Sequence, residues 1–577
     1  EFFRPIPTAV DQDIIKFKAW KLMPNTPDEE FDKGDLLYYS PGDEQAVYSE
    51  YGIAFIDFGR LTPGAIIAQE YEIVDSGLGL FSAEVVAQRQ QPVGEIEIRV
   101  KAPDNWTAHF SALRGASLDY VRDGDWVIWR GEDLPYEPDE PLMPDWKYLE
   151  QRIAVSCSNP AISDSAGANS LASIGQFSDW SQVSRWVAVI YDSLAYTSPE
   201  IEELVDSLTQ DAVSHADTVR RIADFVKREI RYVSVSLGNG RFVPRPAETT
   251  LKNRYGDCKD KTTLTRAMLA AAGIPSAATL ASVQGFVNPY LPTPYQFDHC
   301  IVGAPLADST ALPEHVQVEG QGWSFIDPTD KITPTGELPA ALRGGKILVA
   351  APLDSALVDL PYTTADEWRS EFVSAVELQA DGAISGVTRE TLHGASVWYA
   401  RDGLTRVPDS EVRELWQALL REGSPDARIT DVSRYCDDDS CWTEVHYSVN
   451  RYALLVGAEW FLRPDPLLAG RRRLLQEPTR LHPIWFGAPS CERSTVNWTF
   501  PEGVTPLGTP AAEIELTPGS IKYSFAVTDE NRSVYSREVR LNGEVIEPQD
   551  YPIAQRFDSA LSAYSGQLIN LRVNNEE

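Results

Sequence analysis

Cys258 is the residue whose type and surroundings best suit nucleophilic chemistry, and it lies in the run YGDCKDK. A thiol attacks acyl groups as the thiolate, so its surroundings must stabilise the anion. The preceding Gly-Asp pair predicts a turn with Asp257 as the N-cap of a helix, whose first-turn N–H groups and dipole favour negative charge on the sulfur. Lys259 and Lys261 add positive potential. The carboxylates of Asp257 and Asp260 oppose it.

A thiol nucleophile needs an imidazole, and His299 is the best placed of the seven histidines. It begins the apolar run HCIV downstream of Cys258, where a turn leads into a predicted strand, whereas His315 lies in a predicted loop. Asp327 ends the run SFID, so its carboxylate also lies at a strand end and can orient the imidazole ring. Two neighbouring antiparallel strands would bring His299 and Asp327 together.

Each of these three residues also has an ordinary structural explanation. A cysteine at a helix start is often merely buried, a histidine at a strand start is often exposed, and an Asp-Pro pair is often a turn. The order Cys258, His299, Asp327 within one predicted domain favours a catalytic triad over three unrelated roles. The N–H of Cys258 would be one donor to a developing oxyanion. Tyr255 and Arg254 lie nearby, but the sequence does not identify the second donor.

The elements that must position these residues form a multidomain α+β chain with three predicted domains. Residues 1–165 alternate short β-rich runs with turns, such as EIEIRV at 95–100, which favours an antiparallel β-sandwich. Residues 175–355 switch to helical periodicity, with two helices before Cys258, a third that begins there, and strands after it. Residues 362–577 return to β alternation with two helices, which predicts a second antiparallel β-sandwich-type domain.

The run LKNRYGDCKDK at 251–261 closely resembles the bacterial branch of the transglutaminase-like superfamily of papain-type cysteine enzymes. The runs RPAE at 245–248, FDH at 297–299 and IDPT at 326–329 support the resemblance. That branch places a β-rich domain of unknown function before a transglutaminase-like core and another β-rich domain after it, and the chain resembles it over nearly its whole length. The resemblance implies that Cys258 is the nucleophile, His299 the general base and acid, and Asp327 the orienting carboxylate.

Chemistry common to such triads predicts acyl transfer on protein or peptide amides through a thioester intermediate. An amine acceptor would make the protein a transglutaminase, and water would make it a peptidase or amidase. The alternative is a catalytically silent transglutaminase-like scaffold that binds a cell-envelope partner, and the intact Cys258, His299 and Asp327 favour catalysis. A metal-dependent hydrolase is a third option, which the lack of metal-ligand spacing disfavours.

The 577-residue chain is acidic, with 51 Lys+Arg, 85 Asp+Glu and a formal charge of −34. This charge would repel phosphate backbones and anionic membrane surfaces, so nucleic acid is disfavoured as a partner. No run approaches the roughly 18 consecutive apolar residues of a membrane-spanning helix, so no integral membrane segment is expected. The start, EFFRP, has no signal-peptide layout, and a periplasmic or secreted location, with that segment removed, is the expectation.

Six cysteines are too few for a disulfide scaffold. Cys436 and Cys441 flank the turn DDDS between two predicted strands, and they could form a disulfide, stay reduced or bind a metal. A disulfide would indicate an oxidising compartment. The acidic turn could attract calcium, but it lacks the Gly-centred, alternating spacing of a dedicated calcium loop. We therefore expect no required cofactor, and the dependence on calcium stays open.

Overall fold

The structure of the protein is a computed structural model that describes residues 6–573 with gaps. The gaps are residues 10–11, 25, 40–50, 76–81, 88–90, 105, 114–117, 146–148, 150, 159–176, 178, 234–241, 284–286, 306–311, 354–356, 438–439, 458, 468–471 and 508–510. The chain forms two compact units, one of residues 1–88, 93–134 and 150–361 and one of residues 89–92, 135–149 and 362–577. The boundaries of the three predicted domains stay a prediction.

The N-terminal part of the first unit contains four three-stranded antiparallel sheets. Their strands, in spatial order, are β1 (Ile6–Ala9), β5 (Tyr51–Phe55) and β4 (Leu37–Tyr39); β3 (Glu29–Asp32), β2 (Gln12–Leu22) and β6 (Ile66–Asp75); β10 (Asp119–Asp123), β11 (Trp126–Leu134) and β8 (Val93–Lys101); and β7 (Ser82–Val86), β12 (Arg152–Ser158) and β9 (Thr107–Leu113). The predicted strand at 95–100 lies within β8, where Ile96, Ile98 and Val100 pack in one apolar cluster with Trp129. The β-sandwich class stays a prediction for this part.

The core that carries Cys258 is built on a six-stranded antiparallel sheet in the order β17-β18-β16-β15-β19-β20. Its strands are β15 (Ala277–Ala281), β16 (His299–Pro305), β17 (Val316–Val318), β18 (Gln321–Ile326), β19 (Lys346–Val349) and β20 (Leu357–Asp359). Alternate residues face opposite sides, as the pleat requires. Ala278, Leu280, Val302 and Leu348 pack toward the helices, whereas Ala277, Ile301, Phe325 and Ile347 form a separate apolar cluster.

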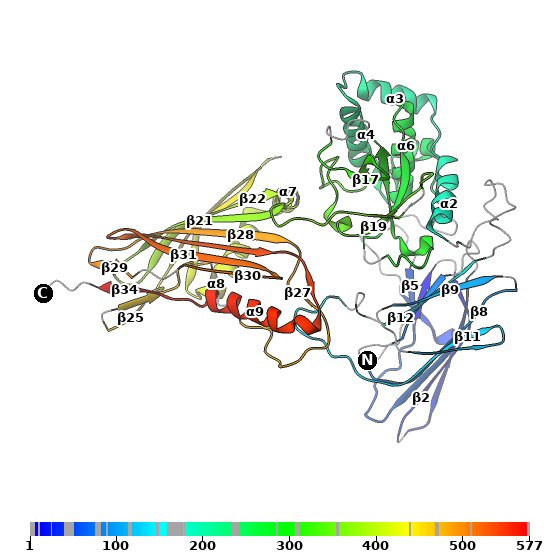
Figure 1. The fold of residues 1–577 in the computed structure, drawn as a ribbon, viewed down its shortest axis with the longest axis horizontal. Helices are drawn as coiled ribbons and strands as arrows, with labels where there is room; N and C mark the ends of the chain where they lie inside the picture. The colour runs from blue at the N-terminus through cyan, green and yellow to red at the C-terminus, as the bar shows by residue number, and fades with distance from the viewer. Residues whose placement is uncertain are drawn as a thin grey trace. The chain divides into compact units, whose positions relative to one another are not determined.

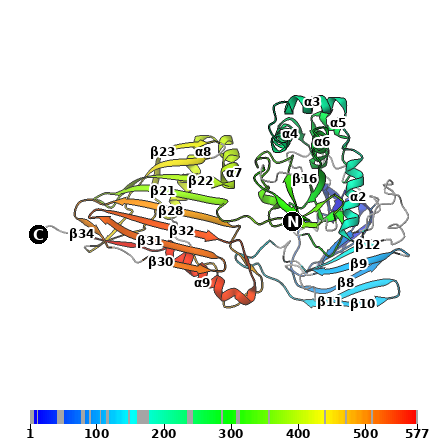
Figure 2. The ribbon, with the colours of Figure 1, turned by 45° about the horizontal axis from the view of Figure 1, so that its top comes forward.

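Five helices of this core lie among the described residues: α2 (Trp180–Asp192), α3 (Pro199–Thr209), α4 (His215–Glu229), α5 (Ala247–Asn253) and α6 (Cys258–Ala271). Figures 1 and 2 show α3, α4 and α6 side by side, and they share one apolar cluster. The sequence predicts α2, α4 and α6 but misses α3 and α5. The start signal of α3 is present, since Ser198 caps its N-terminus and Pro199 is its first residue.

The second unit is built on an eight-stranded sheet in the order β23-β24-β22-β21-β28-β32-β31-β30. Its strands are β21 (Trp368–Leu378), β22 (Ile384–Gly394), β23 (Ala427–Cys436), β24 (Cys441–Val449), β28 (Ser490–Thr499), β30 (Ala512–Leu516), β31 (Gly519–Asp529) and β32 (Arg532–Leu541). The pair β21–β28 is parallel and the others are antiparallel. The prediction of antiparallel pairing is therefore wrong for this one pair, because side-chain alternation carries no information on strand direction.

A four-stranded sheet shares the main apolar cluster of this unit with the large sheet. Its strands are β25 (Leu454–Val456), β26 (Glu459–Leu462), β34 (Ile569–Val573) and β29 (Val504–Pro506). The two predicted helices are α8 (Asp409–Gly423) and α9 (Tyr551–Ser565), and a third, α7 (Ala395–Arg406), was not predicted. The α7 sequence contains Gly403 and has no side-chain N-cap, so it lacks the usual start signal. The sandwich class stays a prediction here too.

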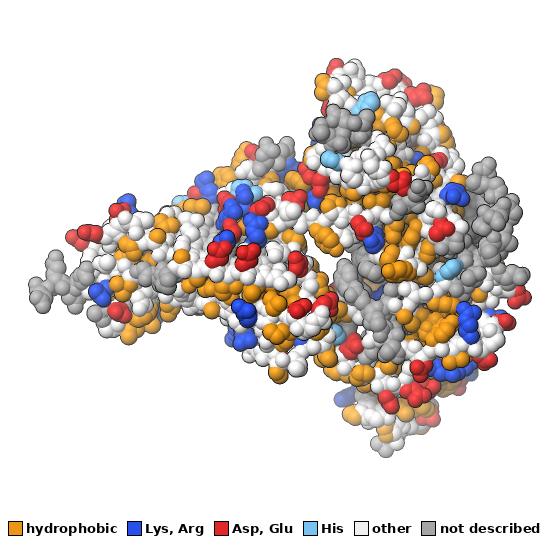
Figure 3. All heavy atoms as spheres, in the orientation of Figure 1, with side chains coloured by type: hydrophobic (Ala, Val, Ile, Leu, Met, Phe, Trp, Pro, Cys, Tyr) orange, Lys and Arg blue, Asp and Glu red, His pale blue; other side chains and the backbone are white. Residues whose placement is uncertain are grey.

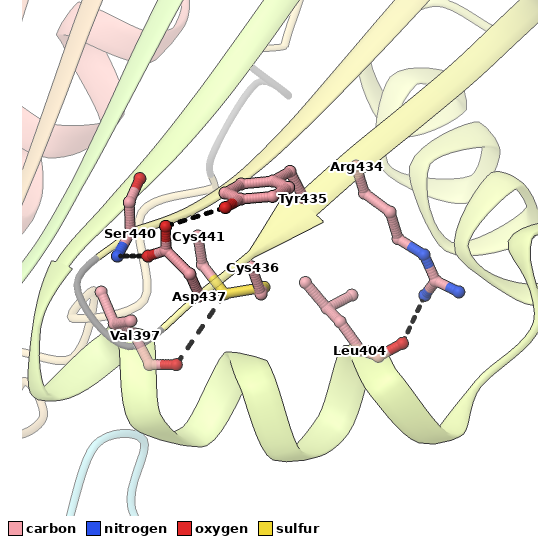
Figure 4. The surroundings of a disulfide bond; sticks show 8 residues. All are labelled: Val397, Leu404, Arg434, Tyr435, Cys436, Asp437, Ser440 and Cys441. Carbon is pink, nitrogen blue, oxygen red and sulfur yellow. Dashed lines mark hydrogen bonds between the residues drawn. A yellow bond between two sulfur atoms is a disulfide. The ribbon is translucent and has the colours of Figure 1, made fainter.

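Cys436 and Cys441 are joined by a disulfide between β23 and β24. This confirms one of the three alternatives that the sequence leaves open. Figure 4 shows the bond beside α7, with the Cys441 sulfur 3.9 Å from the carbonyl oxygen of Val397. Arg434 of the same hairpin donates to the carbonyls of Leu404 (2.6 Å) and Val407 (2.7 Å) at the end of α7. The hairpin therefore fixes α7 at both ends.

Several charged side chains of the second unit form ion pairs. Figure 3 shows acidic and basic side chains intermingled over the face of this unit. Ion pairs there include Arg493–Glu538 at 2.7 Å and Arg389–Glu444 at 2.8 Å. Within the described ranges, no helix is both long and apolar enough to cross a membrane.

Candidate active site

Cys258 is the first residue of α6, and a tight turn places it there. The turn is held by a parallel pair of two-residue strands, β13 (Arg231–Tyr232) and β14 (Tyr255–Gly256). Gly256 has to be glycine, because a Cβ at this position would lie 2.6 Å from the Cβ of Asp260. The chain can therefore enter the helix immediately after β14, with the Cys258 side chain buried at 8% exposure.

The cap of α6 leaves one backbone N–H of its first turn unpaired. Asp257 is the N-cap, as the sequence predicts, and its Oδ1 accepts from the N–H of Lys259 at 2.9 Å and of Asp260 at 3.1 Å. Its backbone carbonyl accepts from the N–H of Lys261 at 3.0 Å. The N–H of Cys258 makes no hydrogen bond with another described residue. A free N–H at a helix start is a donor aimed at negative charge.

The charged neighbours of Cys258 are paired with one another. Lys259 Nζ lies 2.7 Å from Asp257 Oδ2, and both side chains are buried. Asp260 receives two hydrogen bonds from the guanidinium of Arg245, at 2.6 and 2.9 Å. Lys261 instead donates to a main-chain carbonyl at the end of α4, at 2.9 Å. Each carboxylate is thus neutralised by its own cation, so neither opposes a thiolate as strongly as the sequence suggests. The sequence predicts no role for Arg245 beyond its place in the RPAE run.

His299 and Asp327 meet at the ends of neighbouring antiparallel strands. His299 begins β16, and Asp327 directly follows β18. The distance between His299 Nε2 and Asp327 Oδ2 is 2.7 Å. Oδ1 of Asp327 accepts from the N–H of Thr329 at 2.8 Å and from its hydroxyl at 2.7 Å. Burial raises the pKa of Asp327, but His299 and Thr329 outweigh it and lower the pKa to about 2, so the carboxylate is ionised at neutral pH.

The imidazole of His299 also interacts with the thiol of Cys258, which contributes to raising the pKa of His299. Because ionised Asp327 accepts from Nε2, that nitrogen carries a proton and Nδ1 is left for the sulfur. Burial lowers the pKa of His299, but the charge and hydrogen bond of Asp327, together with Cys258, raise it well above its usual value. The structure thus brings the three predicted site residues together. Their catalytic roles stay a prediction.

Aromatic rings surround this site on one side. Phe177, Trp186, Phe242 and Tyr295 form a chain of contacts with centroid distances of 5.7, 5.6 and 5.2 Å. They pack in the same apolar cluster as Cys258. Such a wall excludes water and strengthens the electrostatic interactions of the thiol and the imidazole. These rings are far apart in sequence, so the sequence analysis assigned them no role.

Among the described residues, no group of three or more His, Cys, Asp and Glu side chains is placed to hold a metal ion. In the acidic turn considered for calcium, Asp437 accepts from the N–H of Ser440 at 2.8 Å and from the Tyr435 hydroxyl at 3.0 Å. Asp438 and Asp439 lie outside the described residues.

A helix-seated cysteine facing a histidine and a carboxylate on an antiparallel sheet is the arrangement of papain-type cysteine enzymes. Residues 202–328, which include all three site residues, match the family model of the transglutaminase-like superfamily. Residues 14–136 match a domain of unknown function with a solved structure, DUF3857. The chain is therefore a strand-rich, multidomain protein with a transglutaminase-like core and a DUF3857 domain before it, and the resemblance inferred from the sequence is confirmed.

One solved structure supports this fold. A crystal structure described as a "putative protease" from Parabacteroides distasonis ATCC 8503 matches with a TM-score of 0.59 and 12% identity, over 99% of this chain and 92% of that one. A second, described as a "putative cysteine protease" from Cytophaga hutchinsonii, covers 43% of this chain and 75% of that one at 12% identity. The TM-score of this second match is 0.19. No curated protein matches the chain.

Proposed function

We propose that the protein is a cysteine-dependent acyl-transfer enzyme that acts on protein or peptide amides through a thioester. The observation that carries the proposal is the continuous contact from the Cys258 thiol through the His299 ring to the Asp327 carboxylate. The transglutaminase-like family match supports cysteine-dependent catalysis in general. A silent scaffold would have no need for a buried carboxylate that holds its histidine in one tautomer.

The proposed reaction has two steps. In the first, Cys258 gives its proton to Nδ1 of His299, and the sulfur attacks the amide carbonyl carbon while the carbonyl electron pair moves to oxygen. When the tetrahedral intermediate collapses, the C–N bond breaks, His299 returns the proton to the leaving amine, and a thioester remains. Asp327 stabilises the imidazolium and stays ionised. In the second step His299 deprotonates water or an amine, which attacks the thioester and releases the thiolate.

The acceptor of the acyl group decides the name of the enzyme. Water makes it a peptidase or amidase, and a primary amine makes it a transglutaminase. Incubation of the protein with casein and a fluorescent primary amine distinguishes the two, since new casein fragments indicate hydrolysis and fluorescent intact casein indicates transamidation. Cys258→Ala is the control for both readouts.

We also propose that the protein works in the periplasm or outside the cell and requires no cofactor. The Cys436–Cys441 disulfide supports an oxidising compartment. The mechanism above uses only side chains and backbone groups of the chain. If a chelator abolished the activity and added calcium restored it, the proposal that no cofactor is required would be contradicted.

Alkylation of Cys258 by iodoacetamide tests whether the thiol is activated. If the imidazolium of His299 stabilises the thiolate, Cys258 should react well below the pH range of an ordinary thiol, and His299→Ala should lose this low-pH reactivity. Cys300 is a control, because burial raises the pKa of its thiol to about 12. Equal pH profiles in the native protein and in His299→Ala would favour the silent scaffold instead.

A further inference from the structure

The mechanism needs a second donor to the oxyanion, and Tyr232 lies next to Cys258. Tyr232 is in β13, where its Cα pairs with that of Gly256, two residues before the nucleophile. The N–H of Val233 donates to the carbonyl of Gly256 at 3.0 Å, and the N–H of Arg231 donates to that of Arg254 at 2.9 Å. The Tyr232 backbone is therefore held directly to the turn that carries Cys258.

The Tyr232 side chain points to the same site as the thiol. Its ring is partly buried and packs in the apolar cluster that contains Cys258. Its hydroxyl lies close enough to interact with the charges of Cys258 and Asp257, which raise its pKa, and of Lys259, which lowers it. The hydroxyl makes no hydrogen bond with another described residue. A partly buried phenol beside a nucleophile, with no acceptor for its O–H among the described residues, can donate to an oxyanion.

Three other polar side chains near Cys258 already have partners. The hydroxyl of Tyr255 hydrogen-bonds with Arg245, whose guanidinium lies 5.0 Å from the centre of the Tyr255 ring. The guanidinium of Arg254 lies 5.4 Å from the ring of Phe225 on α4. The hydroxyl of Tyr191 hydrogen-bonds with the buried thiol of Cys300. Tyr255 and Arg254, the two residues that the sequence offers, are thus each in contact with another side chain.

We propose that the Tyr232 hydroxyl and the Cys258 N–H together form the oxyanion hole. This inference rests on the proposed function. When the Cys258 sulfur attacks a carbonyl carbon, the carbon–oxygen π pair moves to oxygen, and the two donors hydrogen-bond to that oxygen without transferring a proton. The C–O double bond re-forms when the leaving group departs, and both donors return to their resting state.

The phenol is suited to this role at any physiological pH. Burial raises the pKa of Tyr232, and the negative charges of Cys258 and Asp257 raise it further. The hydroxyl therefore keeps its proton and stays a donor while the neighbouring sulfur is anionic.

Two reagents that attack the same sulfur separate an oxyanion role from a structural one. p-Nitrophenyl acetate acylates Cys258 through a tetrahedral oxyanion, whereas iodoacetamide alkylates it by displacement at a saturated carbon. Tyr232→Phe should lower the rate of Cys258 acylation roughly 10- to 100-fold and leave the rate of alkylation unchanged. Cys258→Ala gives the background, and Tyr255→Phe, which removes a hydroxyl held by Arg245, should leave both rates unchanged.

Each result supports or overturns the inference. Equal acylation rates in the native protein and Tyr232→Phe would overturn the role of Tyr232 but not the proposed function. A parallel fall in acylation and alkylation would also overturn it, because the tyrosine would then act only on the thiol or the fold. A native protein acylated no faster than Cys258→Ala would overturn the proposed function and this inference with it.

Discussion

Two carboxylates, buried Asp327 in the first unit and half-buried Glu390 in the second, have opposite ionisation behaviour. Asp327 in the transglutaminase-like core accepts three hydrogen bonds, from His299 and Thr329, and these lower its pKa to about 2 despite burial. Glu390 in β22 lies on the inner face of the large sheet, between Phe372 and Thr443 on the adjacent strands. Burial raises the pKa of Glu390 to about 7, and the charge of Glu492 adds to the effect.

The partners of the two carboxylates account for the opposite directions of their pKa shifts. Desolvation penalises the charged form of both groups, but donors that point at Asp327 more than offset it. Glu390 makes no hydrogen bond or ion pair with another described residue. A perturbed pKa by itself therefore does not mark the active site. The direction of the shift, with the donors that cause it, separates Asp327 from Glu390, which has no partner among the described residues.

Replacement of Asp327 should have the largest effect on the acylation rate. Asp327→Asn keeps the shape of the side chain but cannot hold the imidazolium, and the amide can favour the wrong His299 tautomer. We expect acylation of Cys258 by p-nitrophenyl acetate to fall by about two to four orders of magnitude. Asp330→Asn is the control, since that carboxylate caps the backbone N–H groups of Ile332 and Thr333 instead. Asp327→Asn with near-native acylation would contradict the triad.

Replacement of Glu390 should change the stability of the second unit and not the acylation rate. The pKa of Glu390 is raised from 4.5 to about 7, so the native state binds more protons and stability falls as pH rises through that window. Glu390→Gln should remove this loss and stabilise the second unit by roughly 2 to 3 kcal/mol above pH 7, with little change at pH 4.5. Hydrogen exchange of β21 and β22 in the full chain measures the effect.

The control for Glu390 is Glu444→Gln on the adjacent strand. Glu444 pairs with Arg389 at 2.8 Å, with 23% and 49% of the two side chains exposed. Such an ion pair contributes about 1 kcal/mol or less. If Glu390→Gln and Glu444→Gln gave the same pH dependence, Glu390 would not be the group that titrates.

Removal of one donor from Asp327 should have the smallest effect. Thr329→Val deletes the 2.7 Å hydroxyl bond to Oδ1 but keeps the backbone N–H bond. The pKa of Asp327 should rise, so that acylation is lost at a higher pH on the acid side, and the rate at neutral pH should fall by about 3- to 10-fold. Thr335→Val is the control, because its hydroxyl contacts Asp224. If the acid side of the pH–rate profile were the same in Thr329→Val and in the native protein, the Thr329 hydroxyl would not lower the pKa of Asp327.

Local signals were sufficient to predict the elements that hold the site. A helix start is encoded within a few residues, so Asp257 as N-cap and Cys258 as the first helical residue could be read directly. His299 and Asp327 at strand ends followed from short apolar runs beside turns. Other helices were missed: α7 has no side-chain N-cap and contains Gly403, whereas α3 was missed although its start signal is present.

The sequence by itself determined the types and order of the reacting groups, Cys258, His299 and Asp327, and the local structure of each. Only the tertiary structure decided which side chains lie around them: Arg245 at Asp260, Thr329 at Asp327, and near the thiol Tyr232, whose hydroxyl has no partner among the described residues. The physical reason is the distance along the chain over which each effect acts. Capping and alternation act over a few residues, whereas the ionisation of a buried group depends on donors and charges that folding brings from distant parts of the chain.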